Sequence, residues 1–173
     1  MRRISCSILL VFLLGINWNI RAQYNFNVVR TLGETNHQIV YASYSSDGNY
    51  IITTGSDSSI IIWNAEKGTI YKTLTGLKSR QNVALFTPDK KIFISAGEDN
   101  LITLWDPETA TVTGTLKGHS GPVKTLDVSP DSKLLASGGA DRSVLIWDLS
   151  QNSQLFELKG HKKDVNIVRF SPD

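Results

Sequence analysis

Three residues, His119, Ser137 and Asp141, have the side-chain types of a hydrolase triad. In such a triad the imidazole takes the proton of the nucleophilic hydroxyl and the carboxylate orients the imidazole. A catalytic group is needed only once in a chain, however, and the Ser and Asp positions recur here every 42 residues. The chain also lacks the Gly-x-Ser-x-Gly segment that exposes a nucleophile beside an oxyanion hole. We therefore predict a structural role for these side chains and expect that the protein is not an enzyme.

The recurrence belongs to a stretch of glycine, aspartate, apolar residues and tryptophan that occurs three times. Its copies lie at residues 55–64, 97–106 and 138–148, and the tryptophans Trp63, Trp105 and Trp147 are spaced 42 residues apart. A fixed period in this range indicates a repeat architecture.

Each copy predicts four short β-strands joined by tight turns. The run Ile60–Trp63 is apolar at every position, which predicts a strand covered on both faces. The predicted strand ends are Tyr44, Phe86, Val128 and Phe170 for the first strand, Thr53, Ser95 and Ser137 for the second, and Leu74, Leu116 and Leu158 for the fourth. Turn sequences such as Ser129-Pro130-Asp131 follow the first strand, since proline fixes φ there. Four strands per copy make an antiparallel meander.

The third copy resembles a complete WD repeat, the unit of WD-type β-propellers, through Gly118-His119, Ser129-Pro130-Asp131, Ser137-Gly138, Asp141 and Trp147-Asp148. The resemblance extends from about residue 26 to the end of the chain. It implies an all-β fold: a β-propeller of four-stranded antiparallel blades, here a partial ring of about three blades plus extra strands. We expect this domain to occupy residues 23–173.

In that family a His, a Ser or Thr, an Asp and a Trp form a hydrogen-bonded tetrad within each blade. The resemblance implies His119, Ser137, Asp141 and Trp147 in the third copy; Ser95, Asp99 and Trp105 in the second, with Leu77 at the His position; and Thr53, Asp57 and Trp63 in the first, with Thr35 there. His37 lies two residues out of register, and His161 opens a fourth copy. The tetrad would pair buried polar atoms, each of which would cost about 1–3 kcal/mol if left unpaired.

The N-terminus predicts a secretory signal peptide at residues 1–22. Met1-Arg2-Arg3 is basic, residues 8–16 are apolar apart from Gly15, and Ala22 is a small residue at the predicted cleavage site. A membrane anchor is disfavoured, because a hydrocarbon core needs about 20 apolar residues. We expect a secreted or periplasmic mature protein without a membrane span. Cleavage would also remove Cys6, the only cysteine.

Charge bears on the class of partner. The whole chain has 18 basic and 16 acidic residues, and residues 1–22 hold three of the basic ones, so the mature chain would have a net charge of −1. This balance gives no electrostatic case for nucleic-acid binding. His37, His119 and His161 fall in separate loops without nearby cysteines, so we expect no metal and no cofactor.

Function must then lie on the loops, because a fold does not define it. In WD-type propellers the usual binding face carries the His-containing loop and the Gly-Asp turn, and we predict a non-catalytic scaffold that binds protein partners there. The candidate contact residues on that face are Lys78, Arg80, Glu98, Asn100, Arg142, Lys162 and Asp164. Two alternatives stay open: a recognition propeller of a longer enzyme whose catalytic domain lies elsewhere, and an exported enzyme that uses the propeller mouth.

We also expect an incomplete ring, because propellers typically close with 4–8 blades. The strand predicted at 26–32 would belong to the last blade, and the strand predicted at 164–170 would form an unpaired edge, a template for self-association. The outer faces of the first and third blades would be uncovered, including apolar atoms of residues 123–128. Truncation of a longer product, or completion by another copy, would each account for this.

Overall fold

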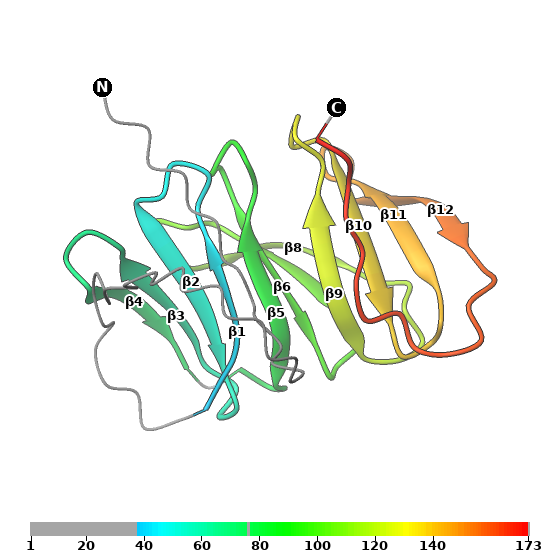
Figure 1. Ribbon diagram of the computed structural model, residues 1–173, viewed down its shortest axis with the longest axis horizontal. Coiled ribbons are helices and arrows are strands. Elements are labelled where there is room, and N and C mark those ends of the chain that lie inside the picture. The colour runs from blue at the N-terminus through cyan, green and yellow to red at the C-terminus, as the bar shows by residue number, and fades with distance from the viewer. Residues whose placement is uncertain (1–37, 76, 173) are drawn as a thin grey trace, which may run out of the picture.

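The computed structural model describes residues 38–75 and 77–172, and every regular element in these residues is a β-strand. Twelve strands form three four-stranded antiparallel sheets, each in simple chain order. The first sheet holds β1 (Ile39–Tyr44), β2 (Tyr50–Gly55), β3 (Ile60–Asn64) and β4 (Thr69–Leu74); the second β5 (Gln81–Phe86), β6 (Phe93–Gly97), β7 (Ile102–Trp105) and β8 (Val112–Leu116); the third β9 (Val123–Val128), β10 (Leu134–Gly139), β11 (Val144–Asp148) and β12 (Ser153–Leu158). The three sheets follow one another along the molecule (Figure 1).

The strand predictions hold closely. The first strands end at Tyr44, Phe86 and Val128, and the fourth strands at the predicted leucines. The second strands run two residues beyond the predicted ends, to a glycine in each sheet. Glycine is needed there because the backbone approaches closely: a Cβ atom on Gly97 would lie 1.9 Å from the Arg80 carbonyl oxygen.

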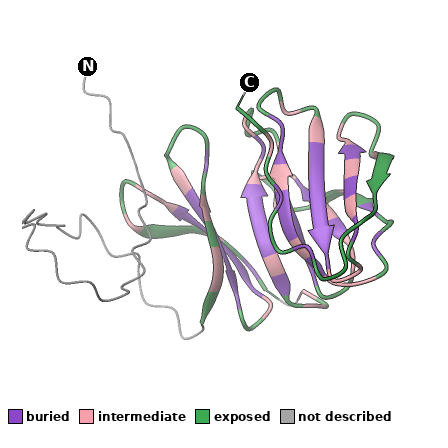
Figure 2. Cartoon of the chain, turned by 45° about the vertical axis from the view of Figure 1, so that its right-hand side comes forward, coloured by how far each residue is buried: buried purple, intermediate pink, exposed green. Residues whose placement is uncertain are grey.

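The core lies between the sheets. The predicted two-sided cover of β3 is confirmed, since Ile60, Ile61, Ile62 and Trp63 are all buried. One apolar cluster joins the first and second sheets through residues such as Ile62 and Phe93, and a second, larger cluster joins the second and third sheets. The first strands β1, β5 and β9 contact one another in turn, whereas β12 is largely exposed (Figure 2).

A β-bulge lies next to each tryptophan. The pairing register of the third and fourth strands shifts between Ile62 and Trp63, between Leu104 and Trp105, and between Ile146 and Trp147. A bulge inserts one unpaired residue and re-aims the side chain beside it. The three sheets thus repeat each other in backbone detail as well as in sequence.

The three turns of each sheet also contain a left-handed residue at the same position in each copy. The residues with positive φ at these positions are Gly48, Lys90 and Ser132; Ser58, Asn100 and Arg142; and Gly68, Ala110 and Asn152. A side chain disfavours the left-handed conformation, so the turns that lack glycine at this position have a less favourable backbone free energy.

The segment after β12 corrects the prediction of a strand at 164–170. It is extended but forms no strand, and it runs along β9 with three of its N–H groups bonded to the third sheet. Val165 N–H donates to the Gly139 carbonyl (3.0 Å), Val168 N–H to Thr125 Oγ1 (3.2 Å) and Phe170 N–H to Asp127 Oδ2 (2.5 Å). Two of the three acceptors are side chains, so the backbone ladder that defines a strand is absent.

The expected exposure of residues 123–128 is also wrong. Val123, Leu126 and Val128 are buried, the first two completely. These side chains turn toward the second sheet and belong to the larger core cluster. On the other face of the third sheet, Val165 and Val168 cover Ala136, so this face is partly covered.

Several predictions fall outside the described residues: the signal peptide at 1–22, the leading strand at 26–32, Thr35 and His37. Among the residues that are described, no helix is long and apolar enough to cross a membrane.

Candidate functional site

The polar side chains of the third sheet form one continuous hydrogen-bonded chain. Trp147 on β11 donates its indole N–H to Ser137 Oγ on β10 (2.8 Å). Ser137 Oγ lies 2.7 Å from His119 Nε2, and His119 Nδ1 lies 2.7 Å from Asp141 Oδ2. Three of the four residues are buried, and Asp141 lies at the rim of the group. All four residues of the predicted tetrad therefore meet.

The Asp141 carboxylate determines which atoms of His119 and Ser137 donate and which accept. Asp141 also accepts the backbone N–H groups of Ser120 (2.9 Å) and Ser143 (3.2 Å). Burial opposes ionisation of Asp141, but the hydrogen bonds from His119 and these two N–H groups outweigh it and lower the pKa of the carboxyl. An ionised Asp141 accepts the Nδ1 proton of His119, which leaves Nε2 to accept the Ser137 hydroxyl proton.

Within the described residues, the first two sheets contain only part of this series of hydrogen bonds. Trp63 donates to Thr53 Oγ1 (2.9 Å) and Trp105 donates to Ser95 Oγ (3.0 Å). Leu77, at the His position of the second copy, packs against the apolar cluster between the first two sheets. Asp99 accepts the Leu101 N–H (3.2 Å).

In the first copy Asp57 accepts from the backbone and hydroxyl of Ser59, at 3.2 and 2.7 Å. The aspartates therefore hold their own turns whether or not a histidine is present.

The triad-like spacing in the third sheet does not give an accessible nucleophile. The Ser137 side chain is completely buried, and its hydroxyl oxygen already accepts the indole N–H of Trp147. A nucleophile must reach a substrate carbonyl near an oxyanion hole. This arrangement pairs buried polar atoms and stabilises the blade.

The seven candidate contact residues lie together at one end of the sheets, which we call the Gly-Asp end because it carries the turns at 55–59, 97–101 and 139–143. Asn100 is half-buried and the other six are exposed. Two of the carboxylates are engaged: Glu98 accepts from Asn82 Nδ2 (2.9 Å), and Asp164 pairs with Lys124 (2.5 Å).

In contrast, Lys78, Arg80 and Lys162 form no ion pair within the part of the chain described here. Cationic side chains at this end are thus left to face solvent.

The opposite end, named here the Pro-Asp end, carries the turns at 45–49, 87–91 and 129–133 (upper edge of Figure 1). The two ends differ in charge. At the Gly-Asp end the basic residues are Lys78, Arg80, Lys117, Lys124, Arg142, Lys159, Lys162 and Lys163, and the acidic residues are Asp57, Glu98, Asp99, Asp141, Glu157 and Asp164. At the Pro-Asp end the basic residues are Lys67, Lys72, Lys90, Lys91 and Lys133, and the acidic residues are Asp47, Glu66, Asp89, Asp106, Glu108, Asp131 and Asp148. A near-neutral chain is therefore divided into a basic end and an acidic end.

Sequence reasoning missed two contacts at the Gly-Asp end, one between the second and third sheets and one between the third sheet and the segment after β12. Asn82 Nδ2 donates to the Val123 carbonyl (3.0 Å) as well as to Glu98. Lys124 holds Asp164, whose pKa is lowered by the hydrogen bond and charge of that lysine. The separations are 41 and 40 residues, close to one repeat, which is the only signal that the sequence contains.

Three four-stranded sheets with a buried Trp–Ser or Trp–Thr pair in each define blades of a β-propeller. The family comparison agrees, because the model described as "WD domain, G-beta repeat" matches residues 26–64, 68–106 and 110–148. The chain belongs to this WD-repeat family.

Similar proteins match this chain over part of their length. The WD repeat domain-containing protein 83 of Danio rerio is 46% identical over 33 residues, which are 19% of this chain and 10% of that protein. Solved structures of RRP9 WD40 repeats and of U3-55K each match with a TM-score of 0.74 and 26% identity over 78% of this chain. The chain spans 42% of the first structure and 43% of the second.

Proposed function

We propose that the protein is a non-catalytic scaffold that binds acidic segments of protein partners at its Gly-Asp end. The observation that carries this proposal is a group of cations, Lys78, Arg80 and Lys162, that form no ion pair within the described residues. The neighbouring carboxylates Glu98 and Asp164 already have hydrogen-bond partners. Electrostatic complementarity of this kind selects the partner and speeds its association.

The rigidity of the sheets supports this function. The loops that present the cations are tied to the strands by backbone bonds, such as the Glu98 N–H to the Arg80 carbonyl (3.0 Å). The cross-sheet bond from Asn82 Nδ2 to the Val123 carbonyl fixes the second blade against the third. A preorganised surface loses little conformational entropy when a partner binds.

We further propose that this scaffold works outside the cytoplasm. The support is the basic, apolar and small-residue pattern of residues 1–22, which is typical of a signal for export. N-terminal sequencing of the product outside the cytoplasm should find Gln23 first. An intact Met1 in an integral-membrane fraction would contradict export.

Charge reversal tests the binding proposal. The triple variant Lys78→Glu, Arg80→Glu and Lys162→Glu should weaken binding of a fluorescein-labelled oligoglutamate peptide at least about tenfold, as expected when several like charges face one another. A matched control is Lys91→Glu with Lys133→Glu, two exposed lysines of the Pro-Asp end.

Equal weakening by both variants would show that net charge alone matters and would overturn the assignment. Tighter binding of a single-stranded oligonucleotide than of the peptide would replace a protein partner by nucleic acid.

A further inference from the structure

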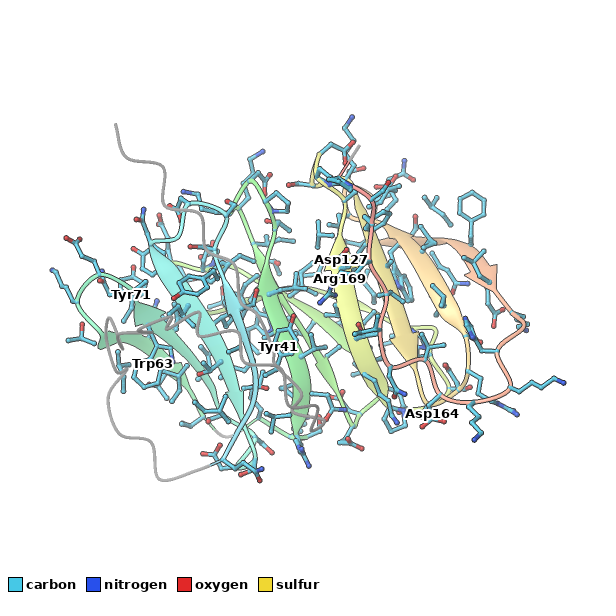
Figure 3. The ribbon with its side chains drawn as sticks, in the orientation of Figure 1. Tyr41, Trp63, Tyr71, Asp127, Asp164 and Arg169 are labelled. Atoms are coloured by element: carbon cyan, nitrogen blue, oxygen red, sulfur yellow. The ribbon has the colours of Figure 1, made fainter. Side chains whose placement is uncertain are left out.

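A hollow of about 320 Å³ opens between the first and second sheets at the Pro-Asp end, away from the cationic face. Tyr50 on β2, Tyr71 on β4 and Phe86 at the end of β5 form its apolar wall, and Ile62 forms its floor. Tyr71 is 50% exposed. Figure 3 shows Tyr71 on the first sheet, far from Asp164 at the Gly-Asp end.

The three aromatic rings are packed against one another. The ring centroids of Tyr50 and Tyr71 are 5.1 Å apart and tilted by 55°, and those of Tyr50 and Phe86 are 6.4 Å apart and tilted by 42°. Phe86 is anchored in turn on the buried ring of Phe93, at 6.1 Å. The wall is therefore continuous with the core.

The next junction, between the second and third sheets, lacks this wall. One repeat further on, the positions of Tyr50, Tyr71 and Phe86 hold Ile92, Thr113 and Val128, and the position of Pro107 holds Leu149. Ile92 and Leu149 pack against the larger core cluster. The aromatic wall is thus a property of the first junction and not of the repeat.

Both tyrosine hydroxyls are available. Among the described residues, neither the Tyr50 nor the Tyr71 phenol makes a hydrogen bond. Two neighbouring phenol donors beside an aromatic wall suit a ligand that offers carbonyl oxygens and apolar rings but needs no backbone acceptor. A proline-rich segment in the polyproline II conformation has these properties, and its preformed helix loses little entropy on binding.

The charges at the rim favour a basic residue beside the prolines. Asp89 and Glu108 border the hollow, and the Glu108 carboxylate has no ion pair among the described residues. Two lysines also lie at the rim, but each already has a polar partner: Lys90 Nζ pairs with Asp47 (2.6 Å), and Lys72 Nζ, 5.9 Å from the centroid of the Tyr71 ring, donates to the Glu108 backbone carbonyl. The Glu108 carboxylate is therefore left for a basic group of the ligand. The Pro-Asp end as a whole is acidic, which attracts a basic flank.

From this geometry we propose that the hollow between the first two blades is a second docking site, which takes a proline-rich, extended peptide with an adjoining basic residue. The prolines contact Tyr50, Tyr71 and Phe86, the two phenols donate to peptide carbonyls, and Glu108 receives the basic side chain. This site is separate from the cationic surface of the proposed function, so the protein can hold two partner segments of opposite charge at its two ends.

Fluorescence polarisation on the full chain tests this site with a labelled peptide of ten prolines followed by two arginines. Binding should saturate, and Tyr71→Thr, which installs the residue of the next blade, should weaken it about tenfold or more, as for an aromatic anchor. Glu108→Gln should weaken it about threefold and reduce its salt dependence.

The matched control is Tyr44→Thr, because Tyr44 is 51% exposed and lies outside the hollow. It should leave the affinity unchanged, and thermal melting of all variants should show that each is folded.

Unchanged binding by Tyr71→Thr, or equal binding of a Gly-Ser peptide with two arginines, would overturn the proposal. The charge-reversal variant of the Gly-Asp end should still bind the proline peptide. That result separates failure of one site from failure of the other.

Discussion

The second and third blades have different residues beside the buried hydroxyl that accepts the tryptophan N–H. In the third blade His119 connects the buried Ser137 hydroxyl to Asp141, whereas in the second blade Leu77 packs on the neighbouring apolar cluster. The tryptophan bond to the hydroxyl is almost equal in both, 2.8 Å and 3.0 Å. The histidine is therefore not required to place the tryptophan. Its contribution is to link the turn after β10 to the loop before β9.

The largest expected effect comes from removing the carboxylate in each blade. Asp141→Ala should destabilise the protein by about 1–3 kcal/mol, because it leaves the His119 ring and two backbone N–H groups without their acceptor. Asp99→Ala should cost less, since Asp99 holds the Leu101 N–H but no imidazole. Urea unfolding of both variants gives the difference. Equal losses would mean that the histidine adds nothing to the blade.

A transplant of the histidine sharpens the comparison. Leu77→His places an imidazole where the second blade has Ser95 and Asp99 already in position. A double-mutant cycle with Asp99→Asn should give a coupling free energy of about 1 kcal/mol. A coupling near zero would show that the backbone of this loop does not allow the tetrad geometry.

Backbone strain in one turn should produce a smaller difference in the free energy of unfolding between the first and second blades. The left-handed turn position after the third strand holds Gly68 in the first blade and Ala110, with φ 58°, in the second. Ala110→Gly should stabilise the protein by about 0.5–1 kcal/mol, because glycine adopts this conformation without a Cβ penalty. The reverse exchange, Gly68→Ala, should destabilise it by a similar amount in thermal melts. A loss of stability in Ala110→Gly would argue that unfolded-state entropy outweighs the strain.

The smallest expected effect is on the acid dependence of the melting temperature, when the Asp141→Asn variant is compared with the parent protein. The pKa of Asp141 is lowered in the folded state, so its ionisation stabilises the fold above its ordinary pKa of 3.8, and this stability is lost as the pH falls through the lower folded value. Asp141→Asn cannot ionise and should flatten the decline in melting temperature below about pH 4. An acid limb identical to that of the parent protein would contradict this role of the carboxylate.

The sequence alone determined the period, the ends of the first and fourth strands of the three sheets and the residues of the tetrad, because each depends on local pattern. Glycine and aspartate mark the turns, apolar runs mark the buried strands, and Trp147 recurs in register with Trp63 and Trp105. The extra two residues of each second strand were missed, since they depend on how closely Gly97 approaches the Arg80 backbone across the sheet.

Tertiary structure decided everything that involves the packing of one blade on the next. Val123, Leu126 and Val128 are buried because they face the second sheet. Residues 164–170 lie against β9 through side-chain acceptors. Neither outcome follows from the pattern within one repeat. The separation of charge between the two ends arises because an antiparallel meander sends alternate turns to opposite ends. The aromatic hollow likewise forms only where Tyr50, Tyr71 and Phe86, from two different sheets, converge. Residues one repeat apart become neighbours through packing, and a sequence pattern shows their equivalence but not their contact.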